Sequence, residues 1–267
     1  MARPPASELA QIADAHARLL AGVAPLSDEQ AAGPSLLPGW TRAEVITHLA
    51  RNADANRRTA EGVLRGETVP KYPGGQAQRT AEIAAGRGRR PAELIADLAR
   101  SVEWLHDTWA ALPPASWDEP GEGPEGPPGR AALWNRWQEV EVHHVDLDLG
   151  YRPEDWPVAF TARLLSRSVA DLPGRAQPDL PPADATWVLW ADDLRLAWAV
   201  TAGGGCVQVD TVAEVEHPDV MVRGPGRQLA AWLLGRLPLD ATGLAVSGDR
   251  LLAVGLPGWF PLREVIG

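Results

Sequence analysis

The chain has 267 residues, of which 45% are hydrophobic and 22% are charged. These values are ordinary for a globular protein, and the length allows one large domain or two modest ones. A formal net charge of −10 disfavours nucleic acid as a partner, since phosphate-binding surfaces need clustered Lys and Arg. The nearest basic cluster, Arg87, Arg89 and Arg90, lies beside glycines and favours a solvated loop.

A single cysteine, Cys206, excludes an internal disulfide. No window approaches the roughly 18 apolar residues that span a bilayer, and the first residues lack the apolar core of a signal peptide. We therefore expect a cytoplasmic protein with no membrane partner.

The first part of the chain predicts four long helices, at about residues 7–24, 41–64, 91–112 and 130–149. Thr41-Arg42-Ala43-Glu44 forms a capping box that opens the second helix. Polar stretches rich in Gly and Pro, at about 66–90 and 113–129, are interpreted as connections. Four helices joined in this way predict a bundle.

The pattern changes after about residue 155. Short apolar or alternating runs predict strands, and Gly203-Gly204-Gly205 predicts a hairpin turn between two of them. The segment 227–237 predicts a helix. The predicted strands are 185–190, 194–202, 206–211, 220–222, 244–246 and 251–254. We therefore predict a two-domain α+β protein, with a helical bundle over 1–155 and a smaller α+β domain over 156–267.

The fourth predicted helix carries two potential metal ligands. Glu139 and His143 are four residues apart, so they project from one helix face. Two ligands are too few for zinc, and the third must come from another helix. His48, within the second helix, is the best candidate, although a lone histidine there also suits a hydrogen-bonded core position. Together they would leave a fourth position open.

Other residues with reactive or ligating side chains are expected to have other roles. His144 is about 100° round the helix from His143 and should not share the site, and Glu141 likewise points away. Asp146 could accept a hydrogen bond from a ligand imidazole, or serve as a cap or surface residue. Cys206 has no CxxC partner, and a nucleophilic role for it is a minor alternative.

Several runs of sequence resemble the mycothiol-dependent maleylpyruvate isomerase family. The resemblance covers most of residues 7–160 and includes loops as well as helices. It is carried by Leu36-Leu37-Pro38-Gly39-Trp40-Thr41-Arg42, His48-Leu49-Ala50-Arg51-Asn52-Ala53-Asp54, Tyr72-Pro73-Gly74-Gly75 with Arg79, Arg136-x-x-Glu139-Val140-Glu141-Val142-His143-His144-Val145-Asp146-Leu147, Gly150-Tyr151 and Asp155-Trp156-Pro157.

The resemblance implies a DinB-like four-helix bundle followed by a domain of the sterol-carrier-protein type. It implies zinc, or another divalent metal, on His48, Glu139 and His143, with mycothiol as the thiol cofactor. The implied reaction is cis–trans isomerisation of maleylpyruvate to fumarylpyruvate, in actinobacterial degradation of aromatics through gentisate. Arg79 and Arg236 match family arginines and are expected to bind the anionic substrate.

The C-terminal half shows fewer family landmarks, which keeps other functions open. One alternative is a mycothiol S-transferase that uses the same metal site on another electrophile. Another is a non-catalytic binding protein. The ligand set would also suit iron, so the sequence does not distinguish the metal.

Overall fold

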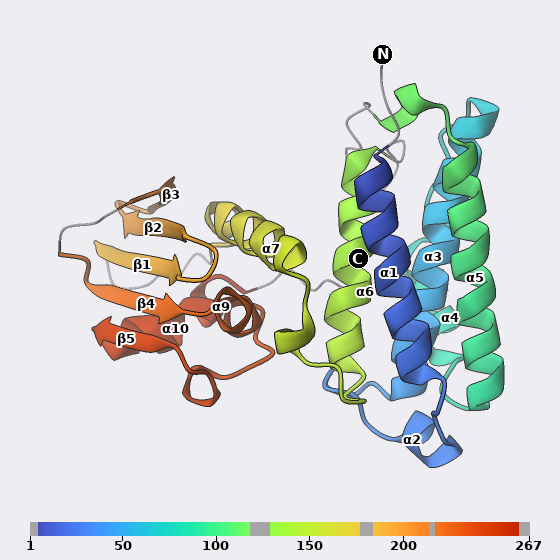
Figure 1. The fold of residues 1–267 in the computed structure, drawn as a ribbon, viewed down its shortest axis with the longest axis horizontal. Helices are drawn as coiled ribbons and strands as arrows, with labels where there is room; N and C mark the ends of the chain where they lie inside the picture. Colours follow the sequence, from blue (N-terminus) through green and yellow to red (C-terminus); the bar gives the residue numbers. More distant parts are fainter. Residues whose placement is uncertain (1–4, 118–128, 177–183, 214–216, 262–267) are drawn as a thin grey trace. The chain divides into compact units, whose positions relative to one another are not determined.

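The computed structural model describes residues 5–117, 129–176, 184–213 and 217–261. The chain divides into two compact units, Met1–Arg152 and Pro153–Gly267 (Figure 1). The first unit is helical and the second combines a sheet with helices, which confirms the predicted fold class. None of the helices in the described ranges is long and apolar enough to cross a membrane.

Four long helices form the bundle of the first unit: α1 (Ala6–Val23), α3 (Arg42–Arg65), α5 (Pro91–Ala111) and α6 (Arg130–Asp146). Within it α3 packs against α5 and α6, and α1 packs against α6 and α5. The capping box that opens α3 is present: the Glu44 amide donates to the Thr41 hydroxyl, and the Thr41 amide donates to the Glu44 carboxylate. Burial of apolar side chains such as Ile12, Leu49 and Leu98 supplies the core.

Two further helices of the first unit were not predicted. The short α2 (Asp28–Ala32) follows α1, and α4 (Gly75–Ala84) lies against α3 within the stretch expected to be a connection. Two glycines at the start of α4 and its short length hide the helical period. This helix carries Arg79, one of the two arginines predicted to bind the substrate.

The last predicted bundle helix ends earlier than expected. Helix α6 stops at Asp146 rather than near residue 149, and Asp148 then adopts a left-handed backbone with φ of 51°. Residues 118–128, within the connection predicted at about 113–129, lie outside the described residues. Before them, Pro114–Trp117 forms a short 3-10 turn.

The second unit contains a five-stranded sheet in the order β3-β2-β1-β4-β5. Strands β1 and β4 run parallel, and the other pairs are antiparallel. The predicted turn between β2 and β3 is confirmed: Gly204 and Gly205 both have positive φ, as a two-residue hairpin requires. The strands are β1 (Ala185–Ala191), β2 (Leu196–Gly203), β3 (Cys206–Thr211), β4 (Val220–Gly224) and β5 (Ala245–Gly248).

Four helices accompany this sheet: α7 (Val158–Ala170), α8 (Leu172–Arg175), α9 (Gly226–Leu233) and α10 (Arg250–Trp259). Helix α9 contacts β1, β4 and α7, and α10 contacts β4. The strand predicted at 251–254 is wrong, since these residues lie in α10. Asp249 caps that helix by accepting from the Leu251 amide, and a short apolar run such as Leu251–Val254 fits either structure.

Candidate metal centre

The three predicted ligands meet inside the helical bundle. His48 lies on α3, and Glu139 and His143 lie one turn apart on α6. All three are buried, with one ligand atom from each within 4.8 Å of the others. Among the described residues, these three side chains form the group that could hold a metal ion.

Glu139 lies between the two imidazoles. Its Oε2 is 2.7 Å from His48 Nε2 and 3.4 Å from His143 Nε2. The two rings are edge to face, with centroids 4.8 Å apart. Burial alone would raise the pKa of Glu139, but the two histidines outweigh it and hold this pKa well below its usual range. The carboxylate is therefore ionised, as a metal ligand must be.

The two imidazoles have different environments. Burial lowers the pKa of His48 to about 4, despite the opposing charge of Glu139. Burial also acts to lower the pKa of His143, but its hydrogen bond with Asp146 and the negative charges of Asp146 and Glu139 raise this pKa to about 9. His143 Nδ1 donates to Asp146 Oδ2 at 2.8 Å, so the hydrogen bond suggested by the sequence is present.

This donor set suits a divalent metal. With Nδ1 of His143 bound to a carboxylate, Nε2 is left facing Glu139, which is the usual arrangement of a metal-binding histidine. Within the described residues this buried Nε2 has no hydrogen-bond partner. Two imidazole nitrogens and a carboxylate oxygen are the ligands of catalytic zinc sites that keep a position open.

The neighbouring His144 faces elsewhere, as its helix position predicts. Its ring stacks on Tyr151, with centroids 3.9 Å apart, and it packs closely against Gly22 of α1. Glu141 also faces away from the three ligands. It accepts from Arg18 at 2.6 Å and from Trp137 at 3.1 Å.

The two predicted arginines lie in different units. Arg79 is buried on α4, and its Nη2 donates to His48 Nδ1 at 3.2 Å. Arg236 belongs to the second unit and follows α9 rather than forming part of it; its Nη1 donates to the Leu234 carbonyl at 2.9 Å. A direct role for either arginine in catalysis stays a prediction.

Three residues that were not predicted as part of the site interact electrostatically with Glu139. Lys71 and Tyr72 precede α4 and are half-buried, and both interact electrostatically with Glu139. Arg136, fully buried one turn before Glu139 on α6, does the same. The sequence holds a positional signal for Arg136, which is three residues before Glu139 and shares its helix face.

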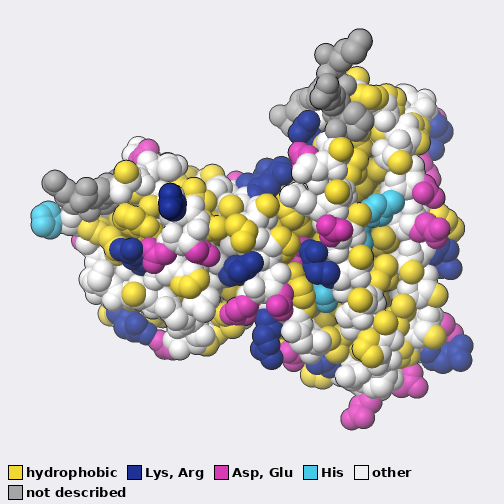
Figure 2. Space-filling model, in the orientation of Figure 1, with side chains coloured by type: hydrophobic (Ala, Val, Ile, Leu, Met, Phe, Trp, Pro, Cys, Tyr) yellow, Lys and Arg dark blue, Asp and Glu magenta, His cyan; other side chains and the backbone are white. Residues whose placement is uncertain are grey.

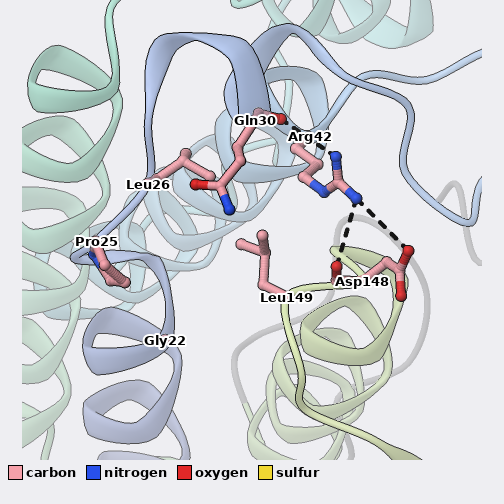
Figure 3. A pocket seen from close by; sticks show the side chains of 7 residues that line it. All are labelled: Gly22, Pro25, Leu26, Gln30, Arg42, Asp148 and Leu149. Carbon is pink, nitrogen blue, oxygen red and sulfur yellow. Dashed lines mark hydrogen bonds and ion pairs between the residues drawn. The ribbon is translucent and has the colours of Figure 1, made fainter.

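A separate cavity of about 320 Å³ lies at one end of the bundle, between α1, α2 and the ends of α3 and α6 (Figure 3). None of the three ligands lines it. Its cation, Arg42, donates to the Leu147 carbonyl at 2.6 Å and pairs with Asp148. This cavity is therefore distinct from the metal centre.

The face of the molecule shown in Figure 2 carries side chains of both charges. On the face shown in Figure 2, Lys and Arg side chains are interspersed with Asp and Glu rather than gathered in one basic patch. This mixture agrees with the net charge of −10.

Comparison with known proteins identifies the family of both units. Residues 12–148 match the mycothiol maleylpyruvate isomerase N-terminal domain, and residues 155–255 match the C-terminal domain of the same family. No curated protein sequence matches the chain.

Among solved structures, the chain is similar to the crystal structure of the mycothiol-dependent maleylpyruvate isomerase. The TM-score is 0.74 at 22% identity, and the match covers 92% of this chain and 95% of that one. A histidine-to-alanine mutant of that enzyme matches with a TM-score of 0.73, at the same identity and coverage. With both of its halves matched by the family models, the chain belongs to the mycothiol maleylpyruvate isomerase family.

Proposed function

We propose that this protein is a mycothiol-dependent maleylpyruvate isomerase that uses a zinc ion held by His48, Glu139 and His143. The observation that carries the proposal is this buried two-histidine, one-carboxylate set, in a chain whose two halves both match the family.

The reaction requires rotation about a carbon–carbon double bond. Addition of a thiolate to one carbon of the cis double bond leaves a single bond, which rotates. Loss of the same thiolate restores the double bond in the trans form, so no thiol is consumed. A divalent metal in this site would supply the thiolate, by lowering the pKa of a thiol that takes its open position.

The protein's own residues would prepare the site for this chemistry. Asp146 fixes the orientation and tautomer of His143. Arg79 is placed to bind a carboxylate of the substrate, since its guanidinium is buried beside His48. Coordination through Nε2 would put the remaining proton of His48 on Nδ1, and Arg79 would then need another acceptor, such as a substrate carboxylate. Arg236 is proposed as a second substrate-binding arginine on family resemblance alone.

The decisive experiment is a spectrophotometric isomerisation assay with maleylpyruvate on protein of known zinc content, with and without mycothiol. We expect conversion that requires mycothiol, stops after treatment with a chelator and returns with zinc. Thiol should remain constant through many turnovers. Stoichiometric loss of mycothiol with another electrophile, and no conversion of maleylpyruvate, would instead identify an S-transferase.

A further inference from the structure

Three residues that interact with the proposed ligands carry buried hydrogen-bond donors without partners. In the described ranges, the Tyr72 hydroxyl, Nε of Arg79 and Nη2 of Arg136 are all buried and have no hydrogen-bond partner. An unpartnered buried polar group costs about 1–3 kcal/mol, so three of them call for an explanation. All three can donate, which points to a ligand rich in acceptors.

The charge of Arg136 points to an anion. Its side chain is fully buried, yet its hydrogen bonds go to neutral groups: His16 Nε2, the Leu49 carbonyl and Asn52 Oδ1. Burial lowers the pKa of Arg136 to about 10, so it stays cationic at neutral pH. A metal bound by Glu139 would use the carboxylate that now offsets this charge, which leaves a net positive site.

Tyr72 is the neutral donor among the three, and its buried hydroxyl is free to donate to such an anion. It lies just before α4, and electrostatic interactions link it to both Arg79 and Glu139. Burial raises the pKa of its phenol, despite the opposing charge of Arg79, so the hydroxyl keeps its proton and can donate. The ammonium group of Lys71, in the same loop as Tyr72, adds a further positive charge that interacts with Glu139.

We propose that Tyr72 is a specificity-determining residue, whose hydroxyl donates to one carboxylate of a dianionic substrate. The inference rests on the proposed function and adds how a second carboxylate of the substrate is recognised. A site built to hydrogen-bond a ligand group rejects the analogue that lacks this group, because its buried donor is then left unpaired. Tyr72 should therefore favour dicarboxylates over monocarboxylates of equal size.

The test compares two small probes that need neither mycothiol nor turnover. Maleate carries two cis carboxylates, and isocrotonate has a methyl group in place of one of them. Binding of each to the zinc-loaded full chain is measured by calorimetry, for the wild type and for Tyr72→Phe. Tyr151→Phe is the matched control, since it removes the other tyrosine hydroxyl, which donates to Glu141.

We expect the wild type to bind maleate more tightly than isocrotonate. Tyr72→Phe should lower this preference about tenfold, as expected for loss of one hydrogen bond to a charged group, and leave zinc content unchanged. Tyr151→Phe should keep the preference. An unchanged preference in Tyr72→Phe, or no binding of maleate by the wild type, would overturn the inference. If Tyr72→Phe lowers the preference for maleate tenfold but the wild type does not isomerise maleylpyruvate, the anion site is supported and the proposed reaction is rejected.

Discussion

His143 and His144 are adjacent in sequence, yet their surroundings differ. His143 lies against Glu139 and Asp146, whereas His144 stacks on Tyr151. We predict that His143→Ala lowers zinc affinity at least about 100-fold, because it removes a ligand. His144→Ala should keep zinc and lose only packing, at about 1–2 kcal/mol of stability.

Zinc content after gel filtration, measured by plasma mass spectrometry, tests this pair of variants. Metal loss in His144→Ala with full retention in His143→Ala would show that the face of α6 has been assigned wrongly.

How far the sequence predicts the site depends on where each residue lies. The four-residue spacing predicted that Glu139 and His143 share one helix face, and a bundle suggested His48 as a ligand from a neighbouring helix. The structure brings these three residues together. Tyr72 and Arg79 could not be placed by such reasoning. They lie in a loop and a short helix whose approach to His48 depends on tertiary packing rather than on a local period.

The packing of α4 against α3 depends on a glycine at the end of α4. A Cβ added at Gly86 would lie 2.0 Å from the hydroxyl oxygen of Thr47, the residue before His48. Gly86→Ala should therefore force the two elements apart and lower the free energy of unfolding by about 1–3 kcal/mol. Gly88→Ala is the control, because a Cβ there meets nothing within 4 Å.

Urea unfolding of both variants, followed by tryptophan fluorescence, measures the difference. Equal midpoints for Gly86→Ala and Gly88→Ala would contradict this close approach.

A buried polar network joins three bundle helices and should make the protein sensitive to acid. His16 on α1 shares a hydrogen bond of 2.9 Å with His106 on α5, and accepts from Arg136 on α6 at 3.0 Å. Burial, together with the charge of Arg136, lowers the pKa of both histidines. Both are therefore neutral in the folded protein near neutral pH.

The sign of the pH dependence follows from these lowered pKa values. As the pH falls below about 6.5, the unfolded chain takes up protons that the folded protein does not, so the free energy of unfolding decreases. His16 alone can contribute up to about 1.4 kcal/mol per pH unit. Urea midpoints at pH 7.5 and 5.5 should differ less in His16→Gln, which can still accept from Arg136. An undiminished difference would assign the acid sensitivity to other groups.

The predictions for the segments of α4 and α10 failed for a shared reason at the level of elements. The long helices have enough turns for their apolar stripe to be recognised, and α3 has a capping box as well. Helix α4 and the region of α10 are short, so a few glycines or a four-residue apolar run obscured their period. In α10 the cap at Asp249 favours the helix, and this cap could be assigned only after the helix was known.

For the whole molecule, metal binding should stabilise the first unit. All three proposed ligands lie between residues 48 and 143, inside Met1–Arg152. Zinc at about 100 times its dissociation constant would add about 2.7 kcal/mol. For a unit of this size, that corresponds to a rise in melting temperature of about 5–10 °C.

Calorimetry with zinc and with chelator measures this shift, and hydrogen exchange locates it. Protection should increase most in α3 and α6. A gain confined to β1–β5 would place the metal in the other unit and contradict the ligand assignment.

Lys71 makes selective chemical modification of an amine possible in this protein. Apart from the amino terminus, it is the only primary amine in the chain, and it lies in the electrostatic reach of Glu139. Burial lowers its pKa, which increases the fraction of reactive free amine. Immobilisation or dye coupling through the lysine amine would therefore modify a residue that interacts with Glu139, whereas thiol coupling would attach to the exposed Cys206 at the start of β3. Reductive methylation with ¹³C would label Lys71 and the amino terminus, and the lysine signal would report on the surroundings of Glu139.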